Sequence, residues 1–160
     1  MDITFKTPEG CFNYRVCGVI IDRERLLAMH DGHAPYFYLP GGRVRLHEAA
    51  EDALRRELRE ELGIEARVVR ALWLNEGFFV EDTTGERYHE LCLYYLVDAT
   101  DSGLPERGDA FSLRDGSNGR VNAFEWLPFD RVKTEYLYPV FIRREIDRLP
   151  DRLTLLTNHD

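Results

Sequence analysis

The chain has 160 residues, a length that most simply makes one domain, and its hydrophobic share of 44% is enough for one core. It has no apolar run long enough for a membrane helix and no signal-peptide pattern, so we expect a cytoplasmic protein with no membrane partner. The formal net charge is −8, and no compact run of Lys or Arg offsets it, which argues against nucleic acid as a partner.

The first half of the chain predicts short strands followed by one strong helix. Residues 12–21 are rich in β-branched and aromatic side chains, and residues 25–29 follow across a turn, a pattern typical of two paired strands. The short apolar run 36–39 is stopped by a Pro-Gly-Gly bend. Residues 47–62 have the clearest helical periodicity, and Gly63 ends it.

The second half predicts further strands, a long loop and a second helix. In chain order these are strands at 67–80 and 88–97, a loop at 100–120, a strand at 123–127, a helix from about 138 to 148 and a short polar tail that we expect to be frayed. Mixed strands with two helices indicate an α/β layered domain over residues 1–160, with its core at about 12–149 and a flexible C-terminal tail.

One face of the predicted central helix is acidic. Glu57, Glu60 and Glu61 fall at i, i+3 and i+4, which places the three carboxylates on one side of a helix. Beside them runs a stripe that should face the sheet, made of Leu54, Leu58 and Leu62. We therefore expect the carboxylates at the edge of the core, where burial and mutual repulsion raise their proton affinities.

A divalent cation would relieve both the burial and the repulsion of these carboxylates. Oxygen ligands on a rigid element suit Mg²⁺ or Mn²⁺ better than zinc, which prefers His and Cys. The three cysteines of the chain are too few and too unevenly spaced for a zinc site or a disulfide framework. The spacing alone equally fits a solvated helix face that pairs with Arg55, Arg56 and Arg59.

The bend Leu39-Pro-Gly-Gly42 directly precedes this helix. Paired glycines let the backbone turn tightly and approach a ligand or a metal without an intervening side chain, so Gly42 is a candidate substrate contact. By itself the sequence Pro-Gly-Gly is typical of an ordinary turn.

Together, residues 42–64 resemble the Nudix signature: a Gly, five residues, a Glu, seven residues, then Arg-Glu-U-x-Glu-Glu-x-Gly-U, with U aliphatic. Every fixed position is filled, by Gly42, Glu48, Arg56, Glu57, Leu58, Glu60, Glu61, Gly63 and Ile64. The resemblance extends more loosely over most of the chain, including the segments 16–21 and 125–128. It implies the family fold, an α/β/α sandwich around a mixed central sheet.

The resemblance also implies site roles. Glu57, Glu60 and Glu61 would coordinate catalytic Mg²⁺ or Mn²⁺, with the Gly41 carbonyl as a further ligand. Either Glu60 or Glu61 would also prepare the attacking water, which leaves the general base open. In addition, an ion pair would orient the helix against the loop, formed by Arg56 and Glu48.

The implied reaction is hydrolysis of a diphosphate bond in a nucleoside diphosphate linked to a group X. The substrate would be a small nucleotide, either an NTP or dNTP or an ADP-ribose-like compound. Members of the family often form homodimers, so a homodimer is one expectation. Two other functions on the same fold stay open, hydrolysis of RNA ends and non-catalytic nucleotide binding. The acidic charge disfavours the first, and the complete set of carboxylates disfavours the second.

The chain departs from many relatives in the loop before the helix and in the loop at 100–120. Arg45 either contacts a phosphate or is simply solvated, and the second interpretation is favoured because most loop arginines are exposed. His47 stands where it would cap the helix. A further carboxylate often comes from the loop before the Glu-Trp strand, and the weak candidates here are Glu106, Asp109 and Asp115.

Several side chains are candidates for binding the nucleotide. Aromatic residues that could stack on a base, or simply pack in the core, are Tyr14, Phe79, Tyr88 and Tyr136. On a predicted strand near the middle of the sheet, His89 and Glu90 either reach the substrate cleft or form a buried pair. Marker residues for one particular substrate are missing after the signature.

Overall fold

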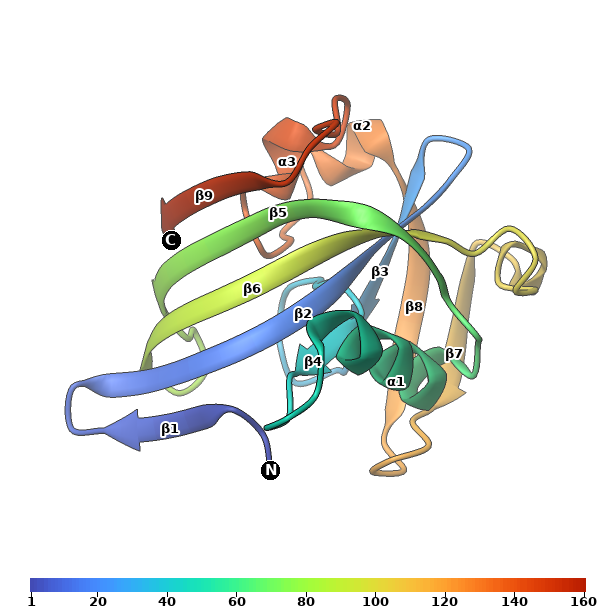
Figure 1. The fold of residues 1–160 in the computed structure, drawn as a ribbon. Helices are drawn as coiled ribbons and strands as arrows, with labels where there is room; N and C mark the ends of the chain where they lie inside the picture. The colour runs from blue at the N-terminus through green and yellow to red at the C-terminus, as the bar shows by residue number, and fades with distance from the viewer.

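The computed structural model describes residues 1–160, and its strands join in one mixed sheet (Figure 1). The strand order is β7-β8-β3-β2-β6-β5-β9, and β1 and β4 pair with β2 outside this path. The β2/β6 and β5/β9 pairs are parallel and the others antiparallel. The strands are β1 (Thr4–Thr7), β2 (Gly10–Asp22), β3 (Arg25–His30), β4 (Gly41–Arg43), β5 (Arg67–Val80), β6 (Arg87–Asp98), β7 (Ala110–Arg114), β8 (Val121–Pro128) and β9 (Thr154–His159).

Helices cover both faces of the sheet. α1 (Ala50–Leu62) lies on one face, and the single-turn helices α2 (Phe129–Val132) and α3 (Ile142–Glu145) lie on the other (Figure 1). Each face of the sheet has its own buried cluster. Because side chains alternate between the two faces along β2, this strand contributes to both clusters: Val16 and Ile20 pack toward α1, while Cys17 and Val19 pack toward α2 and α3. This arrangement confirms the predicted α/β/α sandwich. None of the helices has the length and apolar character that crossing a bilayer requires.

The central helix matches its prediction closely but begins later. The leucine stripe Leu54, Leu58 and Leu62 is buried against the sheet, as the period of the helix predicts. Gly63 ends the helix in the left-handed conformation, at φ 67°, and its N–H bonds to the Arg59 carbonyl. The start at His47 was wrong, because His47 itself has a left-handed backbone, at φ 68°, and Ala49 is the N-cap residue.

Two segments of the second half differ from their predictions. The expected loop at 100–120 contains a 3₁₀ turn, η1 (Pro105–Arg107), and the strand β7, which pairs with β8 and stacks Phe111 on Phe124. The expected helix from about 138 to 148 is reduced to α3, because Leu137 bridges to Phe37 and the Tyr138 N–H donates to the Phe37 carbonyl at 2.9 Å. The second difference arises from pairing with a chain-distant segment, which local periodicity does not report, whereas β7 forms a short hairpin with β8.

The C-terminal residues form a strand, where a frayed tail was expected. β9 runs parallel to β5 at the edge of the sheet (Figure 1), in a register that pairs Leu156 with Asn75 and Asn158 with Gly77. Only alternate residues of β9 turn inward, and of these only Leu156 is apolar. The apolar pattern of β9 was therefore too weak to predict a strand.

Candidate active site

The acidic face of α1 lies at the edge of the core. Glu61 is 8% exposed, and the side chains of Glu57 and Glu60 are 16% and 24% exposed. This order follows from helix geometry, because Glu61 is next to the buried leucine stripe and Glu60 is farther round the helix. The carboxylates are thus partly withdrawn from water, as the sequence predicts.

Burial is also the main electrostatic influence on these carboxylates. It raises the pKa of Glu61 well above its ordinary value, and repulsion from Glu57 adds to the rise, while a 3.0 Å hydrogen bond from the Gly41 N–H opposes it. Burial raises the pKa of Glu57 as well, and a bond from Arg56 opposes that shift. Repulsion from a neighbouring carboxylate therefore adds to the effect of burial, from Glu57 on Glu61 and from Glu60 on Glu57.

The glycine bend approaches the acidic face so closely that no side chain fits between them. A Cβ on Gly42 would lie 2.2 Å from the carboxyl carbon of Glu57. A Cβ on Gly41, whose φ is +153°, would lie 2.1 Å from the Val16 carbonyl oxygen of the neighbouring strand. Both glycines are therefore required by the contact of β4 with α1 on one side and with β2 on the other.

Arg56 joins the loop and the helix. It donates to both carboxylate oxygens of Glu48, at 2.7 and 2.9 Å, and so forms the predicted ion pair. It also donates to the Glu57 carboxylate at 2.5 Å and to the Arg43 carbonyl at 3.1 Å. The bonds from Arg56, with a further one from the Arg45 backbone N–H, lower the pKa of Glu48 to about 2. Arg56 thus holds the helix and the bend in one arrangement.

The three carboxylates have the chemistry of a divalent-cation site, although they do not converge on one point as they stand. Glu57 is turned to Arg56, Glu61 is bonded to the Gly41 N–H, and Glu60 lies 3.5 Å from Arg56. The side-chain-free space at the glycine bend and the repulsion between buried carboxylates both fit a hard cation bound there. The residues present therefore fit a divalent metal, once the carboxylates turn toward it.

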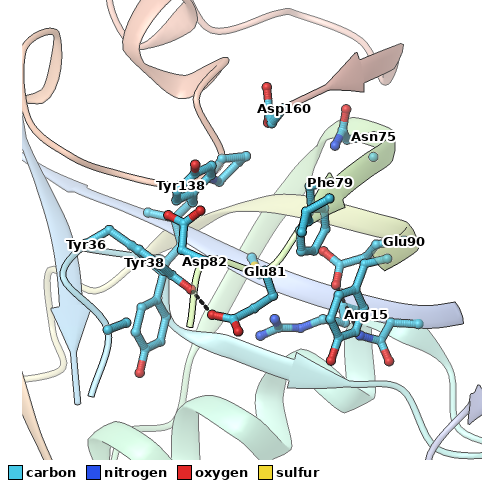
Figure 2. Close-up of a pocket in the computed structure, with 18 of the residues that line it drawn as sticks. Arg15, Tyr36, Tyr38, Asn75, Phe79, Glu81, Asp82, Glu90, Tyr138 and Asp160 are labelled. Atoms are coloured by element: carbon cyan, nitrogen blue, oxygen red, sulfur yellow. Dashed lines mark hydrogen bonds between the residues drawn. The ribbon is translucent and has the colours of Figure 1, made fainter. Parts of the chain in front are cut away.

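A cleft of about 370 Å³ opens beside the glycine bend (Figure 2). It is lined by residues of β2, β4, β5 and β6 and by the loops around 31–39, 81–83 and 138–139. Arg15 and Cys17 are among the lining residues, and in the β2/β4 register they lie opposite Arg43 and Gly41. The cleft therefore borders the bend that contacts Glu57.

The sequence-predicted binding residues divide between the cleft and other surfaces. Glu90 lines the cleft, together with Phe79 and Tyr88. Tyr14 does not, because alternation along β2 turns it to the opposite face, where it packs in the cluster under α1. Tyr14 is therefore corrected from a candidate base-stacking residue to a packing residue.

The remaining candidates near the bend also lie outside the cleft. Gly42 faces Glu57, and Arg45 is 46% exposed, 3.9 Å from both Glu60 and Asp2. His89 bonds to Glu76 at 2.9 Å, so the alternative of a buried pair between His89 and Glu90 is wrong. His47 makes no cap bond to α1.

The loop carboxylates are engaged elsewhere. Asp115 is buried and accepts bonds from the Ser117 N–H and hydroxyl and from the Asn118 N–H, within its own turn. Asp109 pairs with Arg25, at 2.9 Å. Neither of these carboxylates nor Glu106 lines the cleft.

Sequence reasoning missed most of the cleft. Its aromatic side consists of Tyr36, Tyr38 and Tyr138, with Glu81 and Asp82 beside them, while Arg15 and Glu90 lie on the other side (Figure 2). The available signal was alternation on β2, which places Asn13, Arg15 and Cys17 on the face opposite Tyr14. The tyrosines come from two loops whose meeting has no local signature.

An acidic helix turn, a glycine bend against it and an adjacent cleft on an α/β/α sandwich fit the chemistry of a hydrolase that cleaves phosphate anhydrides. The model of the NUDIX domain family matches residues 12–147, and the chain belongs to the Nudix family, as a Nudix hydrolase. Members of this family generally use divalent metal ions.

Individual relatives agree with this assignment. An ADP-ribose pyrophosphatase of Methanocaldococcus jannaschii is 27% identical over 121 residues, which are 74% of this chain and 68% of the relative. A MutT Nudix hydrolase of Burkholderia pseudomallei is 27% identical, with a TM-score of 0.51 and coverage of 75% and 85%. A mutator MutT protein of Bacillus halodurans has a TM-score of 0.63 at 18% identity, covering 92% and 89%, and shows the shared fold.

Proposed function

We propose that this chain hydrolyses the diphosphate bond of an ADP-ribose-like nucleoside diphosphate, with Mg²⁺ or Mn²⁺ as the metal. The observation that carries the proposal is the acidic turn of α1 against the Gly41–Gly42 bend, directly beside a cleft of about 370 Å³. A cleft of this size is within the usual range of small-molecule sites, which is roughly 300–1,000 Å³.

The carboxylates of the acidic turn and Arg56 have different parts in the proposal. Glu57, Glu60 and Glu61 would hold the metal, with the Gly41 carbonyl as a further ligand, and Glu60 or Glu61 would accept the proton of the attacking water. A bound divalent metal neutralises the diphosphate and acidifies a water molecule. Arg56 holds α1 against the loop through its bonds to Glu48 and to the Arg43 carbonyl, and so positions the acidic turn beside the bend.

The charge of the cleft favours a diphosphate with an uncharged group X over a triphosphate. Asp31, Glu81, Asp82 and Asp160 line it, and bonds from Thr83 and Thr84 lower the pKa of Glu81 to about 2, so that this carboxylate is charged at neutral pH. A terminal phosphate would be repelled there, whereas a ribose could donate its hydroxyls to these carboxylates. The name of the relative from M. jannaschii, an ADP-ribose pyrophosphatase, supports the same choice.

The same charges disfavour an RNA end as the substrate. The cleft has an acidic lining, and the arginines that line it are two, Arg15 and Arg43. Two arginines are suited to one diphosphate but not to a longer polyanion, whose binding depends on many phosphate contacts.

A comparison of substrates tests the proposal. With Mg²⁺ or Mn²⁺, we expect ADP-ribose to be cleaved to AMP and ribose 5-phosphate, with a kcat/KM at least about tenfold above that for ATP and the dNTPs, or about 1.4 kcal/mol. The products are separated by chromatography, and a matched reaction contains EDTA. Preference for a triphosphate, or activity that EDTA leaves unchanged, would contradict the proposal.

A further inference from the structure

Arg15 is a cationic side chain without a partner in the protein. It lies on β2 and projects its guanidinium into the cleft (Figure 2). Its Nε is withdrawn from solvent and has no hydrogen-bond acceptor. A buried donor of a charged group costs free energy when it is left unsatisfied, so its position calls for an acceptor that enters the cleft.

A second arginine faces the first across the strands. In the β2/β4 register the partner of Arg15 is Arg43, which also lines the cleft. Like charges directly opposite each other on one face of a sheet are destabilising. Arg43 has only partial compensation, because its Nε donates to the side-chain oxygen of Asn13, a neutral amide, at 3.2 Å.

The nearby carboxylates do not neutralise this pair by direct contact. Glu90 raises the pKa of Arg15 against the effect of burial, yet the Glu90 carboxylate is bonded to Asn13, at 3.5 Å, and forms no ion pair with Arg15. Arg15 also lies close enough to Glu57 and Glu61 for its charge to oppose the rise in their pKa values. The two arginines thus occupy the border between the acidic turn of α1 and the cleft.

We propose that Arg15 and Arg43 form a phosphate-binding pair that holds the substrate diphosphate on the cleft side of the acidic turn. The inference rests on the proposed function for the identity of the anion, and deepens it by naming its protein ligands. Guanidinium groups match phosphate oxygens in charge and in fork geometry, and can contact two oxygens at once. The anion removes the repulsion between the arginines and gives the Nε of Arg15 an acceptor.

Binding of inorganic pyrophosphate to the metal-free protein tests the pair without turnover. Calorimetric titration in EDTA should show saturable binding by the natural chain and at least about tenfold weaker binding by Arg15→Gln. Arg15→Lys should be intermediate, because it keeps the charge but loses the fork. Arg70→Gln is the control, since Arg70 also has a buried, unbonded Nε but donates to the Pro150 carbonyl outside the cleft.

The outcomes separate the pair from the proposed reaction. Equal affinity in Arg15→Gln, an equal loss in Arg70→Gln or no binding by the natural chain overturns the pair. If Arg15→Gln does not fold, Arg43→Gln replaces it in the same assay, and its affinity for pyrophosphate should fall by a similar factor. A chain that binds pyrophosphate through Arg15 but cleaves no nucleoside diphosphate keeps the pair and refutes the reaction. A chain that cleaves ADP-ribose with an unchanged KM in Arg15→Gln refutes the pair alone.

Discussion

At the scale of single residues, Glu61 combines burial with negative charge. The change Glu61→Gln keeps the size of the side chain and an oxygen that can accept the Gly41 N–H, but removes the charge. We expect hydrolysis to fall at least about 100-fold, since even the loss of an outer-sphere partner of a metal site costs up to about that factor. Steady-state rates with saturating Mg²⁺ measure the effect, and retention of full metal-dependent activity would refute the role of Glu61.

The same variant should be more stable than the natural chain at neutral pH when no metal is present. The folded-state pKa of Glu61 is raised above the ordinary 4.5, so the stability contributed by this group is present below about pH 4.5 and is lost as pH rises through the raised pKa. Gln does not ionise, and the stability gained by the variant should therefore grow from pH 4.5 toward neutrality. Denaturant unfolding in EDTA at several pH values tests this trend.

At the scale of elements, the contact between β4 and α1 depends on the missing side chain of Gly42. In Gly42→Ala the new Cβ would meet the Glu57 carboxylate at 2.2 to 2.5 Å, so the carboxylate or the bend must shift. A displacement of about 1 Å costs on the order of 100-fold in rate, and we expect a loss of that size in kcat. A variant with natural kcat would show that the bend is not fitted to Glu57.

Gly116→Ala is the matched control for this change. The loop that contains Gly116 also touches α1, through a bond from its N–H to the Glu60 carbonyl, but a Cβ there would lie at an ordinary 3.5 Å from that oxygen. Its rate and Tm should stay close to those of the natural chain. A loss in both variants would mean that any added methyl near α1 disturbs the site.

The elements also show what the sequence could predict. The acidic turn and the glycine bend lie within about twenty residues of chain and follow helix and turn rules, so the sequence predicted their chemistry, while the Arg56–Glu48 pair was implied by the resemblance to the family. The cleft brings together residues such as Asn13 and Glu90, which are 77 positions apart, and depends on register and on which face each strand turns inward. A shift of one position on β2 would exchange Tyr14 for Arg15 in the cleft, so composition alone does not choose between them.

At the scale of the whole molecule, the C-terminal strand β9 contributes both to the edge of the sheet and to the cleft. β9 is an edge strand, and its side chain Asn158 donates to Asn75, which lines the cleft, at 2.5 Å. The Asp160 N–H bonds to the Phe78 carbonyl at 3.0 Å, and Asp160 also lines the cleft. The last residues therefore contribute both to the sheet and to the wall of the substrate site.

Removal of residues 153–160 should consequently lower both stability and substrate affinity. Loss of the β9 ladder and of the packing of Leu156 should cost about 2 kcal/mol, which lowers Tm by roughly 4–8 °C in a chain of this size. The KM for ADP-ribose should rise while the metal requirement stays, because α1 is untouched. In the full chain, Leu156→Ala should lower Tm more than the control Leu155→Ala, whose side chain is 73% exposed. If the truncation left thermal unfolding unchanged, residues 153–160 would be a frayed tail, as their polar sequence predicts, and not a stabilising strand.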